Sequence, residues 1–393
     1  MGVLLNRAAL ASGIIASGFA LNLGPSASAA VPAPARSTLT YLYGVSCTSK
    51  TSCTAAGYSD TNPPTLTSLA ERWNGTKWAI QHTPNPRGSV FIYGLSCNSA
   101  SACTAVGYSP APGGGSLAER WNGVKWVIQR TPNRPSGSIF YGVSCVSSAA
   151  CTAIGSSGPT SLAARWNGTS WTTMHTPNRP ARDGGTYLRG VSCVARTACD
   201  AVGFVGDESF PEGSVPLAMA WNGSKWAFQS TPTPPQTNNT NLNSVSCVSK
   251  NACTAVGYAA NSDGVGTISL AERWNGVKWV IQPTPNPPGE GDETTLNGVS
   301  CSSRTACTAV GEFYDPVTSA TASLAERWNG TSWTIQHTVN PPGNDVDLFA
   351  VSCSSPGACT ATGRSFRGAV IGWTSLAERW NGSTWAVQRT PNP

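Results

Sequence analysis

Charged residues are scarce in this chain. Lys, Arg, Asp and Glu make up 11% of its 393 residues, against about a quarter in an average soluble protein. The net charge of +6 is spread thinly and no run of Lys or Arg occurs, whereas a nucleic-acid partner calls for a basic stripe. We therefore expect no nucleic-acid partner, and a surface whose polarity comes from Ser, Thr, Asn and Gly.

Histidine is also rare, which argues against a histidine base or a metal centre. The three His residues are His82, His175 and His337. They share one position of an internal repeat, where other copies carry Arg, Ser or Pro, so we interpret it as a tolerant surface position. The Cys-x5-Cys spacing of the chain is not a usual zinc spacing. We expect no metal and no cofactor.

Long apolar segments are missing after the first 30 residues. Before that, Arg7 precedes an apolar stretch over residues 8–23, which is short for a membrane span, and Ala27-Ser28-Ala29 matches a signal-peptidase site. No Cys stands between this stretch and Cys47, which argues against a lipid anchor. The chain is therefore predicted to be secreted, extracellular and monomeric, without a membrane span. Its predicted parts are a signal peptide (1–29), a linker (30–38) and one folded domain (39–393).

One unit of about fifty residues is repeated seven times. It reads G-V-S-C-x5-C-T-A-V-G-Y, then a variable stretch, then S-L-A-E-R-W-N-G-x-K-W-x-I-Q-x-T-P-N-P, with substitutions. A fixed period of this length is typical of stacked or circular repeat folds. It argues against a conventional active site, because catalysis usually needs residues that occur once.

Every cysteine belongs to one of these units. An even number of Cys at a fixed spacing in an exported chain indicates disulfides. One bridge inside each unit satisfies all the pairs with a single geometry, so we predict a local disulfide per unit and no free thiol. The 14 Cys form the predicted pairs Cys47 with Cys53, Cys97 with Cys103, Cys145 with Cys151, Cys193 with Cys199, Cys247 with Cys253, Cys301 with Cys307 and Cys353 with Cys359.

Each unit predicts four short antiparallel strands. In the first unit the expected strands are residues 41–46, 54–58, 69–73 and 77–81. Asn74-Gly75 is a strong hairpin turn because both residues tolerate positive φ, and the prolines that follow end the fourth strand. Seven such units predict an all-β fold, a seven-bladed β-propeller of four-stranded blades. A linear solenoid is the alternative, but neither end carries an atypical capping repeat.

Strand alternation assigns the connections to two rims. If strands A to D of a blade run outward from the axis, the A–B and C–D connections share one rim, and these are uniform in the sequence. The B–C and D–A connections share the other rim and vary in every unit. Insertions gathered on one face usually mark the binding face. The two Trp of each unit flank the Asn-Gly turn, and we expect them to pack between blades.

The pattern G-V-S-C…C-x-A-V-G…W-N-G-x-x-W resembles secreted bacterial repeat propellers. More distantly, it resembles Asp-box (sialidase-type) and photosystem-assembly-factor propellers. An Asp-box has Ser and Asp seven and five residues before its Trp, but here Glu71 and Trp73 stand at those distances from Trp78. No unit supplies the arginine triad, Tyr/Glu pair and acid that sialidases use. The resemblance therefore implies the fold, and fold alone does not confer activity.

Trp373 is the one Trp outside the repeat scheme. It stands in the variable B–C segment of the seventh unit, close in sequence to Arg364, Phe366 and Arg367. An aromatic ring with nearby guanidinium groups suits stacking on a sugar or peptide ring, and packing of the loop on itself is the alternative. Further candidates for ligand binding on the same face are Phe210, Phe313 and Tyr314.

The L-A-E-R-W strand predicts ion pairs between blades. Adjacent strand residues point to opposite faces, so Glu of one blade can meet Arg of the next. Pairing the Glu of one blade with the Arg of the next also accounts for Ala164 and Ala220. Ala164 replaces the Glu and Ala220 replaces the Arg of the same pair, so both partners are missing together. The predicted pairs are Glu71–Arg120, Glu119–Arg165, Glu272–Arg327, Glu326–Arg379 and Glu378–Arg72.

The sequence favours a non-catalytic binding protein that recognises a glycan or another extracellular macromolecule through its variable B–C/D–A face. A sialidase-like glycoside hydrolase or lyase is one alternative, and carboxylates or arginines converging at the axis of that face would distinguish it. A structural adhesin or envelope protein is the other alternative.

Overall fold

The computed structural model consists almost entirely of β-strands. In the part of the chain that it describes there is one short helix, α1 (Gly368–Ile371), and no helix long and apolar enough to cross a membrane. The segment predicted as a signal peptide and the candidate Phe210 lie outside the described residues. The described residues are 38–62, 65–86, 88–110, 114–132, 137–180, 184–207, 213–261, 266–287, 293–340 and 345–393.

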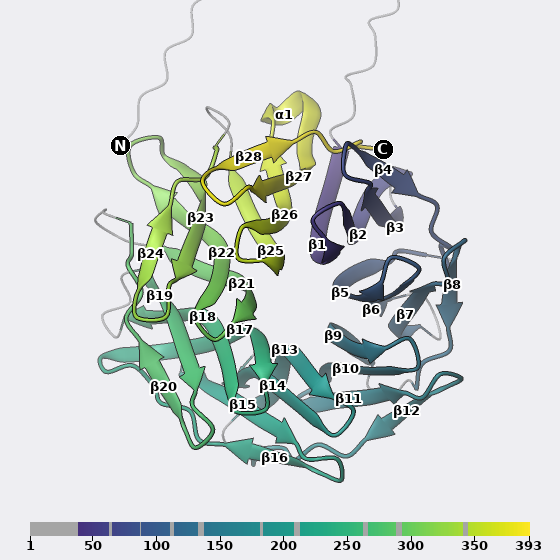
Figure 1. Cartoon of the computed structure of the whole chain (residues 1–393). Helices are drawn as coiled ribbons and strands as arrows, with labels where there is room; N and C mark the ends of the chain where they lie inside the picture. Colours follow the sequence, from purple (N-terminus) through teal and green to yellow (C-terminus); the bar gives the residue numbers. More distant parts are fainter. Residues whose placement is uncertain are drawn as a thin grey trace, which may run out of the picture. The chain divides into compact units, whose positions relative to one another are not determined.

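Each repeat forms one four-stranded antiparallel blade, and the blades surround a common axis (Figure 1). Blade 1 consists of β1 (Thr38–Ser49), β2 (Ser52–Asn62), β3 (Thr65–Trp73) and β4 (Trp78–Gln81). Blade 2 consists of β5 (Phe91–Ser99), β6 (Ala102–Ser109), β7 (Gly115–Trp121) and β8 (Trp126–Gln129). Blade 3 consists of β9 (Ile139–Ser147), β10 (Ala150–Ser157), β11 (Thr160–Trp166) and β12 (Trp171–Met174). Blades 4 and 5 are β13 (Gly185–Ala195), β14 (Ala198–Gly206), β15 (Val215–Trp221), β16 (Trp226–Gln229); β17 (Thr237–Ser249), β18 (Ala252–Asn261), β19 (Thr267–Trp274), β20 (Trp279–Gln282). Blades 6 and 7 are β21 (Thr294–Ser303), β22 (Ala306–Asp315), β23 (Ala320–Trp328), β24 (Trp333–Gln336); β25 (Val346–Ser355), β26 (Ala358–Phe366), β27 (Gly372–Trp380), β28 (Trp385–Gln388).

The seven-bladed propeller predicted from the repeats is confirmed. The ring is closed by main-chain pairing between the first and last blades. The start of β1 runs parallel to the start of β27, with Thr38 opposite Gly372 and Leu39 opposite Trp373. This pairing joins blades 1 and 7 into one eight-stranded sheet.

The seven predicted disulfides are confirmed, one inside each blade, and no cysteine is free. In every pair the two cysteines lie directly opposite each other on the two innermost strands of the blade. The second cysteine is buried in the core and the first is half-buried, so the bridge fastens the A–B turn to the packing between blades. The bridges are Cys47 to Cys53, Cys97 to Cys103, Cys145 to Cys151, Cys193 to Cys199, Cys247 to Cys253, Cys301 to Cys307 and Cys353 to Cys359.

A second closed ring explains the invariant Ser of the V-S-C motif. The backbone N–H of Cys97 donates to Ser46 Oγ of the preceding blade at 2.9 Å, and Cys47 N–H donates to Ser352 Oγ across the closure at 2.9 Å. The same bond recurs at every other blade interface. A hydroxyl in each innermost strand therefore fixes the position of the next blade along the propeller axis.

The W-N-G turn is wider than the sequence predicts. Trp73 pairs with Trp78, which leaves a four-residue loop. Gly75 has φ of +100°, whereas no Asn of the described turns has a positive φ. The Asn74 side chain instead accepts hydrogen bonds from the backbone N–H of Thr76 and Lys77, at 2.9 and 3.0 Å. Asparagine is thus needed as an acceptor, as in Asx-turns.

The second Trp of a unit helps to join the blades in five of the seven units, as expected for this residue. Trp78 is 4% exposed, and its Nε1–H donates to Gln388 Oε1 of the preceding blade at 2.9 Å. Trp126 makes the same bond with Gln81 at 3.1 Å.

The predicted ion pairs between blades are wrong. Glu71 faces the preceding blade, where Ser375 Oγ lies 3.4 Å from its Oε1. Arg72 faces the following blade and donates to the carbonyl of Ala100 at 2.7 Å. Glu of one blade and Arg of the next therefore point away from each other. Where Arg and Glu do share an interface, Arg extends to the rim and Glu stays inside, as Glu119 does beside Ser68.

Candidate functional site

A cavity of about 1170 Å³ lies on the axis of the propeller, walled by the innermost strands of all seven blades. Its lining also includes Gly266, Thr267 and Glu293. Gly266 and Thr267 stand where the B–C connection of blade 5 ends, and Glu293 stands where a D–A connection ends. The cavity therefore reaches the rim that carries the variable connections.

One position of the innermost strand supplies the most varied side chains of this wall. It immediately precedes the Gly/Ala/Ser-Val/Leu-Ser-Cys motif, whose own residues hardly change. In every blade the pairing of the two innermost strands skips this position, as in a β-bulge, and its residue lines the cavity. Its occupants in blades 1 to 7 are Tyr43, Tyr93, Tyr141, Arg189, Asn243, Asn297 and Phe349.

Aromatic rings form a continuous arc along one side of the cavity. Phe349 stacks on Tyr43 with ring centroids 4.4 Å apart and 5° between the planes. Tyr43 meets Tyr93 edge to face at 5.7 Å, and Tyr93 lies 5.5 Å from Tyr141. The guanidinium of Arg189 ends the arc, 4.1 Å from the centre of the Tyr141 ring.

Burial raises the pKa of two phenol groups at this arc. It raises the pKa of Tyr93 to about 12, helped by the neighbouring Tyr141 and Tyr43. The same cause raises the pKa of Tyr58, which stacks on Tyr43 from the second strand of blade 1. These hydroxyls can therefore donate hydrogen bonds over the whole neutral pH range.

The opposite side of the cavity is polar. Asn297 Nδ2 donates to Glu312 Oε2 at 2.5 Å and to the carbonyl of Leu348 at 3.1 Å. Burial raises the pKa of Glu312 to about 8, and the nearby Asp347 carboxylate adds to the shift. In blade 5, Asn241 Nδ2 lies 2.5 Å from the Tyr258 hydroxyl. This side offers amide, hydroxyl and carboxyl groups opposite a wall of rings.

The structure brings together three of the residues singled out in the seventh unit. Trp373 is half-buried and lies 5.3 Å from Phe366, centroid to centroid. The Arg364 guanidinium stands 3.9 Å from the Trp373 ring centre and its Nε donates to Asp347 Oδ2 at 2.5 Å. Arg364 also lies 5.5 Å from the Phe349 ring, which links this group to the aromatic arc.

The other candidates lie apart from that group. Arg367 is exposed just before α1. Tyr314 is 40% exposed near the end of β22, and the adjacent Phe313 packs partly against the core. Trp373 itself belongs to strand β27 and not to a loop, because its main chain pairs with Leu39.

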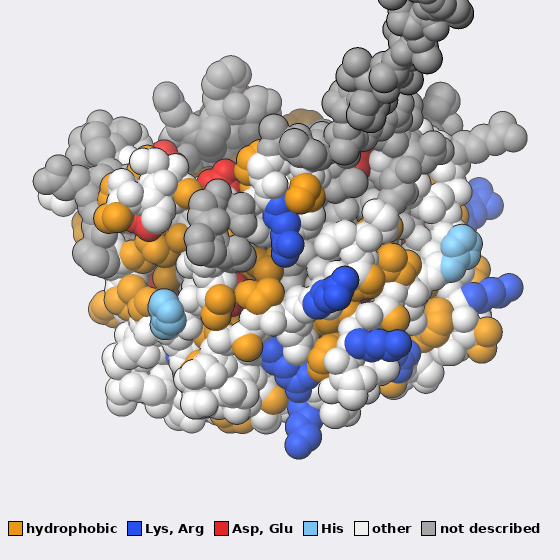
Figure 2. Space-filling model, turned by 90° about the horizontal axis from the view of Figure 1, so that it is seen from above, with side chains coloured by type: hydrophobic (Ala, Val, Ile, Leu, Met, Phe, Trp, Pro, Cys, Tyr) orange, Lys and Arg blue, Asp and Glu red, His pale blue; other side chains and the backbone are white. Residues whose placement is uncertain are grey.

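Two further expectations concern the surface. His82, His175 and His337 are all exposed just after the outermost strands, at the position interpreted as tolerant. On the side of the molecule shown in Figure 2, Lys and Arg stand singly or in small groups and Asp and Glu are few.

Sequence reasoning missed the axial ring because it looked for function in the connections. The available signal was the single variable position inside an otherwise constant strand. Tyr in three units, Arg in one, Asn in two and Phe in one is too mixed a set for a packing position. Alternation along the strand did not predict its direction, because the pairing of the two innermost strands skips this position in every blade.

No protein-family model matches the sequence, and no curated protein matches it. Solved structures do match. A GH74 xyloglucanase from Xanthomonas campestris gives a TM-score of 0.54 at 13% identity, over 89% of this chain and 54% of the xyloglucanase. YCF48 from Cyanidioschyzon merolae gives 0.51 at 12% identity, over 89% of this chain and 97% of YCF48. A fucose-specific lectin from Aleuria aurantia gives 0.48 at 11% identity, over 91% and 96%. At these identities the likeness shows a β-propeller fold alone.

Proposed function

We propose that this protein is a secreted, non-catalytic propeller that binds a glycan in the axial cavity, entering from the variable B–C/D–A rim. The arc of Phe349, Tyr43, Tyr93 and Tyr141 facing the polar side of the cavity carries this proposal. One side of the cavity presents apolar ring faces, and the opposite side presents hydrogen-bonding groups.

A sugar ring has the same two-sided character. Its C–H face packs on aromatic rings, and its hydroxyls need donors and acceptors whose positions fix the orientation. Tyrosine hydroxyls, the amides of Asn243 and Asn297, and the Glu312 carboxyl supply such groups. The volume of about 1170 Å³ exceeds the roughly 300–1,000 Å³ typical of small-molecule pockets, so it suits more than one sugar unit.

The proposed location outside the cell rests on two observations. Seven disulfides hold in the folded chain, and such bridges persist in oxidising compartments. The first 29 residues read as a signal peptide. A disulfide-braced propeller with a polar, weakly charged surface fits an extracellular environment.

A glycan array with the oxidised protein tests the proposal, followed by titration of the best ligand against variants. Tyr93→Ala should weaken binding at least about tenfold, because stacking on an aromatic ring contributes roughly 1–3 kcal/mol. Tyr93→Phe keeps the ring and should lose less. Tyr314→Ala, an exposed ring outside the cavity lining, is the matched control and should bind normally. Equal loss in Tyr93→Ala and Tyr314→Ala would place binding elsewhere.

A glycoside hydrolase is the second candidate, and one observation favours it. Glu312 has its pKa raised to about 8 by burial, with Asp347 adding to the shift, while Asp347 pairs with Arg364. Glycosidases use two carboxyl groups of which one stays protonated and the other ionised. Release of reducing sugar from a bound glycan, abolished in Glu312→Gln, would establish hydrolysis. Binding without release supports the lectin-like function.

A further inference from the structure

The Arg that follows Glu in the third strand caps the next blade. Arg120 donates to the carbonyl of Ser148, in the disulfide turn of the following blade, at 2.5 Å. Its guanidinium also stands 5.9 Å from the Trp166 ring of that blade. Equivalent contacts to a turn carbonyl, a Trp ring or both occur for Arg72, Arg273, Arg327 and Arg379. The guanidinium thus fills a recess between a turn and an indole.

Blade 4 departs from this arrangement at two neighbouring positions. Ala220 replaces the Arg, and Asp200 replaces the Thr of the C-T-A motif. Asp200 and Ala220 lie directly opposite each other on adjacent strands, just as Thr54 and Arg72 do in blade 1. The change removes a positive charge and adds a negative one at the same place.

A cavity of about 460 Å³ occupies the space between blades 4 and 5 at this point. It is lined by Ala220, Asp200, Lys250 and the Trp274 ring, among others. Trp274 is the ring that an Arg at position 220 would cover, and the Lys250 carbonyl is the turn acceptor that such an Arg would reach. Both recognition groups are therefore present, while blade 4 lacks the Arg side chain that fills the recess at five of the other interfaces.

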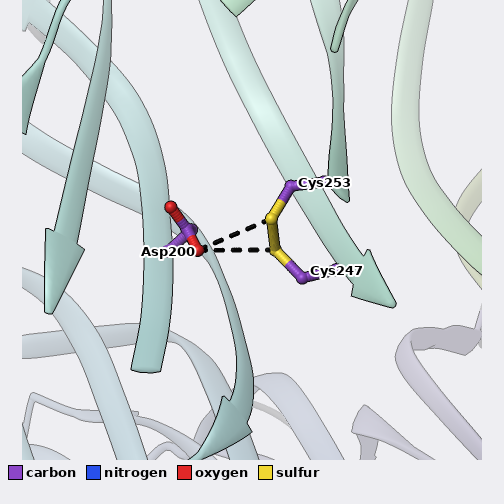
Figure 3. A group of neighbouring side chains, drawn as sticks. All are labelled: Asp200, Cys247 and Cys253. Carbon is purple, nitrogen blue, oxygen red and sulfur yellow. Dashed lines mark hydrogen bonds between the residues drawn. A yellow bond between two sulfur atoms is a disulfide. The ribbon is translucent and has the colours of Figure 1, made fainter. Parts of the chain in front are cut away.

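Asp200 is buried, with 6% of its surface exposed. Figure 3 shows its carboxylate facing the Cys247–Cys253 disulfide, with Oδ2 3.5 Å from Cys253 Sγ and 3.7 Å from Cys247 Sγ. These sulfurs are bonded to each other and have neither a proton to donate nor a thiolate for a metal. This group of three is therefore not a metal site, although its atoms lie within 4.8 Å of one another.

The acid lacks a cationic partner within the described part of the chain. Gln229 hydrogen-bonds to it, but burial still raises its pKa to about 6. Lys250, the other charged residue of the lining, is exposed and forms no ion pair with it. A carboxylate in this environment gains from any cation that enters the cavity, since a buried charge is costly when it is unpaired.

We propose that the recess between blades 4 and 5 binds a guanidinium group supplied from outside, such as an arginine side chain of a partner protein. The ligand takes the place that Arg120 and its equivalents occupy at other interfaces. It stacks on Trp274, donates to the Lys250 carbonyl and pairs with Asp200. This site lies on the rim of the disulfide turns, opposite the rim proposed for the glycan.

A guanidinium fits better than an ammonium group because of its shape. It is planar and presents donors at its edge, so it can stack on an indole while its N–H groups bind a carboxylate and a carbonyl. An ammonium group is strongly hydrated and cannot make all of these contacts together. The other blades agree with this preference, since the position equivalent to Ala220 carries Arg in six units and Lys in none.

Isothermal titration of the intact, oxidised protein with N-acetyl-arginine methylamide tests the proposal. The matched probe is N-acetyl-citrulline methylamide, which has the same shape without the charge. We expect the citrulline probe to bind at least about tenfold more weakly, because it loses the charge-assisted hydrogen bonds. The corresponding lysine probe should also bind more weakly. Absence of arginine binding, or equal affinity for the citrulline or lysine probe, overturns the proposal.

Two variants restore the residues that other blades carry. Ala220→Arg should abolish binding because the chain then fills its own recess, and Asp200→Thr should weaken it at least about tenfold by removing the counter-charge. Lys125→Gln, an exposed change on the same rim in blade 2, should leave binding unchanged. If Ala220→Arg does not fold, Asp200→Thr alone decides the outcome. Unchanged affinity in a folded Asp200→Thr protein contradicts the site.

Discussion

In five of the seven blades an indole N–H makes one of the bonds that join neighbouring blades. The second Trp of a unit donates to a Gln in the outermost strand of the preceding blade, as Trp171 does to Gln129 at 2.9 Å. The same bond is made by Trp78, Trp126, Trp279 and Trp385. Unit three carries Met174 in place of Gln, and the Nε1 of Trp226 in the next blade is buried without a partner. The Nε1 of Trp333 is also buried without a partner, although the preceding blade carries Gln282.

The first prediction follows from that irregularity. Gln129→Met should lower the free energy of unfolding by about 1–3 kcal/mol, because it leaves the buried Trp171 N–H unsatisfied. Blade 3 already accommodates Met at this position, so steric conflict is not expected. Urea denaturation of the oxidised protein measures the change. Thr173→Met, on an exposed neighbour of Met174, is the control and should change stability by less than about 0.5 kcal/mol.

At this scale the sequence identified positions but not partners. Repetition showed that Gln129 and its equivalents matter, but the Trp–Gln bond joins residues 42 apart in the chain. Likewise, the Asn74-Gly75 turn was located correctly, while the role of Asn as an acceptor was not. Local propensity describes a residue's own backbone, and the partner depends on how blades pack.

The B–C segment of blade 7 closes the ring and also borders the candidate glycan site. Trp373 lies 6.5 Å from Tyr41 of blade 1, centroid to centroid, and its main chain pairs with Leu39. Replacing residues 363–375 with residues 155–161, the short B–C segment of blade 3, would test this segment as a whole. The structure shows that this swap would also remove Arg364 and leave the buried Asp347 unpaired. A point substitution is therefore the sharper test of the element.

The second prediction concerns Trp373→Ala. If Trp373 contacts the ligand, glycan affinity should fall by about tenfold or more, while Trp373→Phe retains much of it. Both variants keep the Gly372–Trp373 main chain and hence the pairing that closes the ring. Unchanged binding in a folded Trp373→Ala protein would show that this ring serves only packing against Phe366 and Tyr41.

At the scale of the whole molecule, the features that recur in every unit predicted the architecture, and the departures from the repeat predicted little. The number of blades, the strand order and the local disulfides all follow from one unit and its period. The mode of closure was not predicted, because the pairing of Thr38 with Gly372 depends on how two neighbouring blades pack; a similar parallel bridge joins Thr267 to Glu293 between blades 5 and 6. The ion pairs failed for a related reason. Alternation shows that Glu71 and Arg72 face different neighbours, but not which neighbour each one faces.

The correct arrangement places a ring of buried acids between the blades. Glu71, Glu119, Glu272, Glu326 and Glu378 are at most 1% exposed. Burial raises the pKa of each to about 8, and serine hydroxyls of the preceding blade offset part of this shift in most of them. Glu272 has both oxygens buried without a partner. At neutral pH these side chains are mostly neutral acids.

The last prediction is that the protein loses stability as the pH rises from about 5 to 8. Each acid has a pKa of about 8 in the folded state, above the value of about 4.3 for unfolded Glu. Between these values the unfolded chain has released protons that the folded chain still holds, so protons favour folding. The stabilisation is complete below about pH 4.3, declines as the pH rises, and is lost above about 8.

Urea denaturation at half-unit pH intervals measures this slope, and Glu272→Gln isolates one member of the ring. The amide keeps the shape of the side chain and cannot ionise, so the variant should lose up to about 1.4 kcal/mol per pH unit of the wild-type slope between pH 5 and 8. Between pH 5 and pH 8.5 the free energy of unfolding should also fall less in the variant than in the wild type. Glu293→Gln removes an exposed carboxyl and should leave the slope unchanged. A stability that stays level or rises over this range, or the same slope in Glu272→Gln as in the wild type, would mean that the inter-blade acids are ionised in the folded ring and that charge, not a neutral acid, lies between the blades.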